Sequence, residues 1–242
     1  MKSGLKELNL ENQYFTNNDY LAFKPSRWED DSKEAVKERS KTADKLLDLH
    51  DQIYPKFKEL KMINLNPHFN KKNITSSTTH SEGYTSKRLS SVWLHYGKSE
   101  KQIKSYEKYY YGSKPIYQDN HDNLMSFINH IRLQVIVGME QSDKEYRLGT
   151  WLVLGKDNNG GIIDRGYFKQ KLVEQTNQNV FFELCKSLPE GFWMNIGEEA
   201  KDIHKDLDTS SQLIGFAKKD RPSVYFIIGR TYLESVPILV EN

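Results

Sequence analysis

The chain has 242 residues, of which 28% are charged and 37% hydrophobic, and its net charge is +2. This balance of charge, together with an aromatic content of 12%, argues against a disordered chain. A lone cysteine, Cys185, excludes an intrachain disulfide, and no apolar run is long enough to span a membrane. We therefore expect a cytoplasmic protein without a membrane partner.

The first predicted elements are an arm and a long helix. Residues 1–31 mix asparagines, acids and scattered rings, and this mixture predicts an arm that packs on a single domain, 1–242. A helix is predicted to begin after the N-cap Ser32 and to run to about Tyr54, because apolar residues recur there at helical spacing. Pro55 is expected to kink or end this helix.

A basic segment, 56–117, follows the helix. It holds twelve Lys and Arg residues and four acids, a local net of +8, so that the remainder of the chain carries −6. Turn formers over 62–91 predict loop and short strand, followed by a strand around Val92–Tyr96 and a helix around Ser99–Tyr110. Ten aromatic residues are interleaved with the lysines. This composition is typical of surfaces that bind phosphates and unstacked bases, and also of an ordinary solvated loop.

The clearest pattern in the sequence is an alternation with a period of two. It covers Ile131–Met139 and resumes over Tyr146–Leu154, and it predicts an antiparallel hairpin at about 125–155. Residues two apart share a face of a strand, so His130 and Arg132 are expected to project together with Gln134. Such residues can form an acid–base site, and they are also common on the solvated face of a sheet.

The C-terminal part predicts one more group of elements. These are an interrupted helix over 164–188, a strand at Phe192–Ile196, an acidic surface helix at Glu198–Asp208, and a strand pair formed by Gln212–Ala217 and Val224–Gly229. Strands joined by short turns, with helices before and after them, predict an α+β fold. In this fold an antiparallel sheet carries its helices mainly on one face.

The candidate nucleic-acid contacts come from the basic segment. Its lysines can neutralise phosphates, and its rings can stack on bases. The alternative interpretation is a solvated helix face with tyrosines packed behind it, or a basic face that docks on an acidic protein partner. The candidate residues are Lys87, Arg88, Trp93, Tyr96, Lys98, Lys101, Lys104, Lys108 and Lys114.

A metal-dependent nuclease is the catalytic alternative. Many nucleases of the restriction type use an acid followed by a strand with an acid-any-Lys triplet, because two carboxylates hold the metal and the lysine steadies the attacking water. Here Asp122 and Glu140 precede Glu145-Tyr146-Arg147, in which arginine replaces the lysine. Mg²⁺ is expected as a cofactor only under this alternative, and no His or Cys spacing predicts a metal site.

The sequence thus predicts a nucleic-acid-binding protein. The lysine- and asparagine-rich composition favours a prokaryotic or phage DNA-handling or defence system. Two alternatives remain open: the metal-dependent nuclease, and a protein-interaction subunit of a larger complex that uses its basic face. The predicted partner is a nucleic acid or, for the second alternative, an acidic protein.

Overall fold

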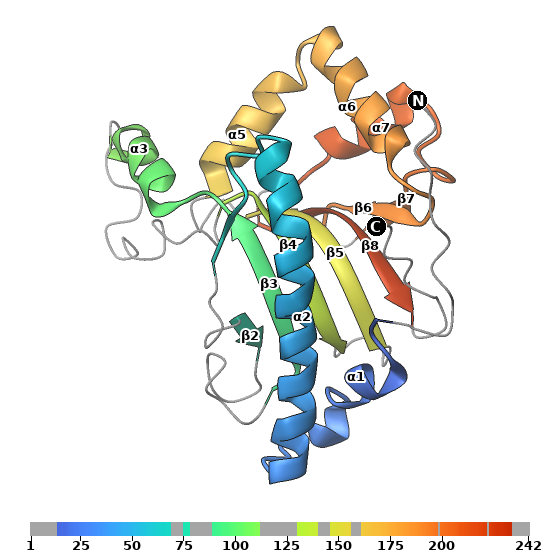
Figure 1. The fold of residues 1–242 in the computed structure, drawn as a ribbon. Helices are drawn as coiled ribbons and strands as arrows, with labels where there is room; N and C mark the ends of the chain where they lie inside the picture. Colours follow the sequence, from blue (N-terminus) through green and yellow to red (C-terminus); the bar gives the residue numbers. More distant parts are fainter. Residues whose placement is uncertain are drawn as a thin grey trace.

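A computed structural model describes residues 14–68, 75–77, 89–111, 130–139, 146–155, 161–197, 199–221 and 223–233. Within these ranges, eight strands form one antiparallel sheet in the order β1-β3-β4-β5-β8-β6-β7, with β2 also paired to β3 (Figure 1). The strands are β1 (Asn66–Pro67), β2 (Thr75–Ser77), β3 (Ser91–Gly97), β4 (Arg132–Met139), β5 (Tyr146–Leu154), β6 (Phe192–Asn195), β7 (Ala200–Asp202) and β8 (Phe226–Leu233). The antiparallel α+β class and the central hairpin β4–β5 are thereby confirmed.

The described helices surround this sheet at its ends and along one side (Figure 1). They are α1 (Asn17–Leu21), the 3₁₀ turn η1 (Pro25–Arg27), α2 (Lys33–Glu59), α3 (Glu100–Tyr111), α5 (Gly161–Lys171), α6 (Gln175–Ser187) and α7 (Ser210–Lys218).

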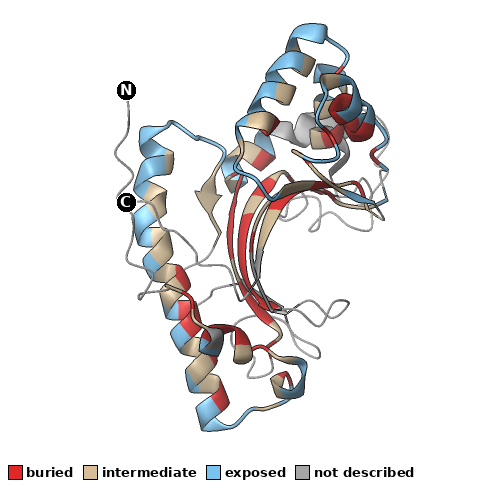
Figure 2. Ribbon diagram, turned by 90° about the vertical axis from the view of Figure 1, so that its right-hand side faces the viewer, coloured by how far each residue is buried: buried red, intermediate tan, exposed pale blue. Residues whose placement is uncertain are grey.

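Alternation along the strands sorts their side chains onto two faces. On the first face, α1 and α2 pack on β3 and β4 in an apolar core that includes Phe23, Leu46 and Leu94. A second core on the same face joins α5, α6 and α7 to β5, β6 and β8 around Met194 and Ile228. Both cores therefore place their helices on one face, as predicted. Figure 2 shows α2 along the convex side of the curved sheet, so the other face is concave.

Helix α2 begins as predicted and ends later. The Ser32 hydroxyl accepts a hydrogen bond from the Ala35 amide at 3.3 Å, which caps the helix. Pro55 was predicted to kink or end the helix; it does not end it, because α2 continues to Glu59. Proline removes one backbone hydrogen bond near the end of the helix, and the last turn is held by packing: the Phe57 ring meets the Tyr96 ring edge-on at 5.2 Å.

Two C-terminal predictions are also wrong. The expected acidic helix at 198–208 is replaced by β7 and a turn, in which the Asp202 carboxylate accepts from the amides of His204 and Lys205. The expected strand at 212–217 lies within α7. There Thr209 and Gln212 form a capping box, and this local signal outweighs the short apolar run that favoured a strand.

A left-handed residue ends α2. Lys61 has a φ of 54°, its amide donates to the Lys58 carbonyl at 3.0 Å, and the Met62 amide donates to the Phe57 carbonyl at 2.9 Å. This pair of bonds is a Schellman motif, in which the left-handed position usually holds glycine because a Cβ atom is strained there.

Glycine at position 61 is expected to stabilise the protein. Lys61→Gly removes the Cβ strain and should raise the free energy of unfolding by about 1 kcal/mol, measured by urea denaturation. Lys61→Ala is the matched control, since it removes the charge and keeps the strain. Equal stability of the two variants would contradict the strained geometry.

Candidate functional site

Three of the chain's four tryptophans lie on the concave second face of the sheet. Trp93 comes from β3, Trp151 from β5 and Trp193 from β6, and each is half-buried. Register places polar residues of β3, β4 and β8 on the same face. We call this surface the indole face, and define it as Ser91, Trp93, His95, Arg132, Gln134, Trp151, Trp193 and Thr231.

The indoles form a continuous row of ring contacts. The Trp93 and Trp151 centroids lie 5.9 Å apart in an edge-on arrangement, and those of Trp151 and Trp193 lie 6.2 Å apart. The Trp93 ring also stacks on His95 at 5.6 Å, and its Nε1 donates to the Ser91 hydroxyl at 2.6 Å. These contacts fix the orientation of the rings before any ligand arrives.

Two glycines make room for the central indole. A Cβ atom on Gly229 would lie 2.4 Å from Trp151 Cδ1, and one on Gly149 would lie 2.8 Å from Trp151 Nε1. Neither distance is compatible with a side chain, so the Trp151 ring occupies space that exists because both residues are glycine.

Polar atoms are buried around these rings. Gln134 Nε2 lies 3.3 Å from His95 Nδ1, and both residues are buried. Among the described residues, Trp151 Nε1 and Thr231 Oγ1 are buried without a hydrogen-bond partner. An unsatisfied buried polar group costs about 1–3 kcal/mol, so the packing around the Trp151 ring holds these two atoms in place at the expense of stability.

The electrostatics of the indole face are set by one arginine and a neutral histidine. Burial, and after it the charge of Arg132, lowers the pKa of His95 to about 3, so this imidazole is neutral at neutral pH. The buried Arg132 guanidinium lies 5.4 Å from the centre of the Tyr225 ring. The face therefore combines a buried cation and buried hydrogen-bonding groups with flat rings that are half-buried.

A buried charged cluster lies at one end of the indole face, next to the end of β3 and the start of β4. Asp164, in the first turn of α5, pairs with Lys98 and accepts from the Ile131 amide at 2.6 Å, and its Oδ2 lies 3.3 Å from His130 Nδ1. Burial alone would raise the pKa of Asp164, but His130, Lys98 and the Ile131 amide outweigh it and lower the pKa to about 2. The cluster thus ties the ends of β3 and β4 to α5.

Two predicted nucleic-acid contacts lie in the interior instead. Tyr96 is fully buried on the helix-covered face, where its ring stacks on His50 at 5.8 Å and its hydroxyl lies 3.0 Å from His50 Nδ1. Lys98 is buried and neutralised by Asp164. Strand alternation puts Tyr96 on the face opposite to His95, so neither Tyr96 nor Lys98 offers a surface to a nucleic acid in this structure.

The other predicted residues divide into three groups. Trp93 and Arg132 lie on the indole face, and His130 lies buried beside it rather than on the strand. Lys101 and Lys104 are exposed on α3, which also carries Lys108. Outside the described residues lie Lys87, Arg88, Lys114, Asp122, Glu140 and Glu145. Over the ranges that the structure describes, no group of His, Cys, Asp or Glu residues is arranged to hold a metal ion.

Sequence reasoning missed Trp151 and Trp193 as partners of Trp93. The available signal was the alternation within each strand. Trp93, Trp151 and Trp193 lie an odd number of positions from the core residues Leu94, Leu154 and Met194, which places the tryptophans on the opposite face. The role of Asp164 carried no such signal, because its partners come from residues 98, 130 and 131.

Filling the space beneath Trp151 is expected to disturb the indole face. Gly229→Ala should displace the ring and lower the free energy of unfolding by about 1–3 kcal/mol, with a changed near-UV circular dichroism spectrum. Gly166→Ala is the matched control, since nothing lies within 4 Å of its added Cβ and α5 should gain stability from alanine. Similar effects of both variants would contradict the packing described.

Breaking the buried cluster is expected to lower the free energy of unfolding by an amount that depends on pH. Asp164→Asn removes the buried carboxylate that pairs with the Lys98 ammonium and should lower the free energy of unfolding by about 3–5 kcal/mol at neutral pH. The carboxylate's folded pKa of about 2 lies below its ordinary value of 3.8, so its contribution is present above about pH 4 and lost as the pH falls towards 2.

Chemical denaturation of both proteins across this pH range measures the effect. The difference from the wild type should shrink as the pH falls. Asp44→Asn, at an exposed position, provides a control that removes one carboxylate without breaking a buried ion pair. A penalty for Asp164→Asn that stays constant down to low pH would contradict the assignment.

Comparison with known proteins gives no family assignment: no protein-family model matches the chain, and no curated protein is significantly similar to it. None of the helices within the described ranges has the length and apolar composition needed to cross a bilayer.

Proposed function

We propose that this protein binds single-stranded nucleic acid on the indole face, with lysines of α3 contacting the phosphates. The observation that carries the proposal is the row of Trp93, Trp151 and Trp193 on one face of a sheet whose apolar cores lie on the other face. A sheet face that presents aromatic rings is a known platform for splayed-out bases, because every base has a flat face that can stack.

Hydrogen-bonding groups beside the rings support the same function. A base stacked on an indole gains roughly 1–3 kcal/mol, and the edge of the base can bond to neighbouring polar groups. Trp151 Nε1 is a donor, and the Thr231 hydroxyl and the Gln134 amide can donate and accept; all three groups are buried beside the rings in the unbound protein. A base edge carries both kinds of group, and so it fits this mixture better than an aliphatic ligand does.

A single strand fits better than a duplex because its bases can leave the stack. Bases inside a duplex are covered on both faces by their neighbours, so indoles cannot reach them without unpairing. Phosphate contact requires exposed cations, and Lys101 and Lys104 are exposed on α3, at a spacing of three residues that places them on one side of the helix.

The setting we propose is cytoplasmic, in keeping with the lone Cys185, which is buried. The composition of the chain supports a prokaryotic or phage DNA-handling or defence system as the context.

Fluorescence anisotropy with labelled oligonucleotides tests the proposal. Single-stranded DNA or RNA should bind more tightly than duplex in the presence of EDTA, and binding should weaken with salt. Trp93→Ala and Trp193→Ala should each weaken binding about 10-fold, in line with the loss of one stacked base. Ligand binding should also quench the intrinsic tryptophan fluorescence, to which the three indoles contribute.

Two controls separate stacking from general effects. Tyr167→Ala removes an exposed aromatic ring from α5, away from the indole face, and should leave affinity unchanged. Lys101→Glu with Lys104→Glu should reduce the salt dependence, whereas Lys37→Glu with Lys41→Glu on α2 should not. No binding of single strands at low salt, or equal losses in the Tyr167 and tryptophan variants, would overturn the proposal.

A further inference from the structure

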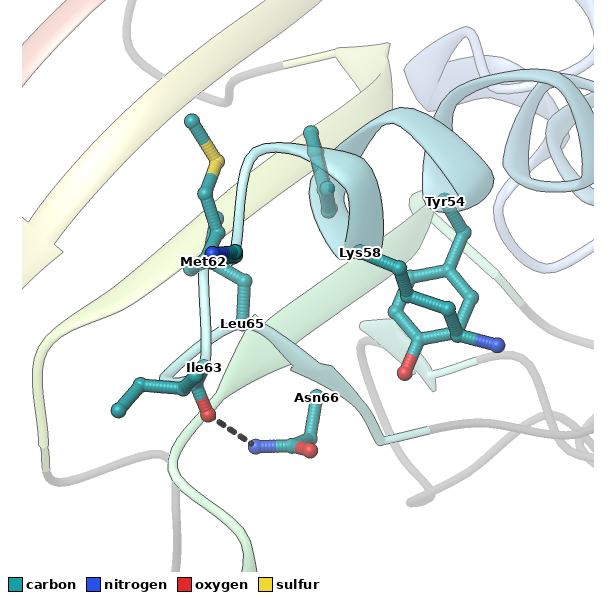
Figure 3. A pocket seen from close by; sticks show the side chains of 8 residues that line it. Tyr54, Lys58, Met62, Ile63, Leu65 and Asn66 are labelled. Atoms are coloured by element: carbon teal, nitrogen blue, oxygen red, sulfur yellow. Dashed lines mark hydrogen bonds between the residues drawn. The ribbon is translucent and has the colours of Figure 1, made fainter.

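A basic and apolar surface lies where α2 ends. We call it the α2-end patch, and define it as Lys58, Leu60, Lys61, Met62 and Ile63. All five residues are exposed, with Leu60 at 67% and Ile63 at 73%. Beside them is a hollow of about 340 Å³, whose lining also includes Tyr54, Phe57, Leu65 and Asn66 (Figure 3). Large aliphatic side chains exposed together around a hollow are typical of an interaction site.

The α2-end patch is held in a defined shape. The Schellman motif fixes Lys61 and Met62, and Lys58 Nζ lies 4.6 Å from the centre of the Tyr54 ring. The Ile63 carbonyl accepts from Asn66 Nδ2 at 3.2 Å (Figure 3) and from Gln102 Nε2 at 2.9 Å. A surface that is ordered beforehand loses less conformational entropy when it docks.

A second surface, formed by α6 and the two residues before it, has the opposite charge and a similar apolar content. We call it the α6 patch, and define it as Val173, Glu174, Val180, Glu183 and Leu184. All five residues are exposed, with Val173 at 75% and Leu184 at 61%. The lysine of this helix, Lys186, is directed elsewhere, because its Nζ donates to the Ile203 carbonyl at 2.7 Å.

We propose that the α2-end patch of one copy docks on the α6 patch of a second copy. Charge complementarity carries the assignment: Lys58 and Lys61 face Glu174 and Glu183, while the aliphatic side chains of the two patches bury one another. The hollow at the end of α2 then receives an aliphatic side chain, and the exposed Leu184 is the candidate from the α6 patch.

The arrangement of the elements favours a symmetric pair. Figure 1 and Figure 2 both place the end of α2 and helix α6 at the same end of the molecule, and Figure 2 draws the two helices well apart. The two patches of one chain are therefore too far apart to contact each other. Two copies related by a two-fold axis form the contact twice, since each one supplies both patches.

Sedimentation velocity over a range of protein concentrations, without nucleic acid, tests the pairing. The wild-type protein should dimerise, and more weakly as salt increases. Lys58→Glu with Lys61→Glu should weaken dimerisation at least 10-fold, and Glu174→Lys with Glu183→Lys should do the same, because each change places like charges together. Leu184→Ala tests the apolar contact and should also weaken the dimer.

The decisive measurement is a mixture of the two charge-reversed variants. Each alone should be monomeric, while the mixture should form heterodimers. In the mixed pair, one of the two contacts regains its ion pairs with the signs inverted, and the other keeps the wild-type ion pairs. Lys37→Glu with Lys41→Glu is the matched control and should leave the dimer intact. A monomeric wild type at all concentrations, or a mixture that stays monomeric while both variants are folded by circular dichroism, would overturn the proposal.

Discussion

Each strand of this sheet has to place successive side chains on opposite faces, and the rest of the structure depends on that constraint. In β3, Leu94 and Tyr96 enter the core beneath α2, so Trp93 and His95 must project to the concave side. In β5, Leu154 packs under α5 to α7, which leaves Trp151 on the concave side as well. Because these residues point into the cores, the aromatic and polar residues that alternate with them point to the second face.

The start of α5 links this sheet to the surrounding helices in two directions. Asp164 reaches β3 and β4 through Lys98 and the Ile131 amide. The next residue, Arg165, is buried and donates to both carboxylate oxygens of Asp220 at 2.7 Å, and its Nε donates to the Gly155 carbonyl at 2.6 Å. Buried charges persist only when they are paired, so these two neighbours fix the position of α5 on the sheet.

Period-two patterns made the central part of the fold predictable from sequence. The alternation over Ile131–Met139 and Tyr146–Leu154 predicted the hairpin, and it placed Arg132 and Gln134 on one face as the register shows. Short C-terminal elements were not predictable in this way. A run such as 212–217 is compatible with strand or helix, and the capping box at Thr209 and Gln212 decides between them.

The candidate site was only partly predictable, because charge and ring counts carry no information about faces. Tyr96 and Trp93 are equally aromatic, yet their odd and even positions place one in the core and the other on the indole face. Lys98 and Lys101 are equally basic, but only the first meets a buried carboxylate, which comes from position 164. Contacts between residues so far apart in sequence arise from the fold and not from local composition.

Dimerisation and single-strand binding together have a physical consequence for affinity. A dimer formed through the end of α2 and the α6 patch carries two indole faces in one particle, because each copy contributes one and neither patch includes residues of that face. When a strand is bound to one indole face, its free part is present at the other face at an effective concentration. That concentration is set by the length of nucleotide chain between the two faces. Short strands fill one face at a time, and their affinity reports the stacking alone. Strands long enough to span both faces gain affinity without any new contact, and this gain disappears when the charges of either patch are reversed.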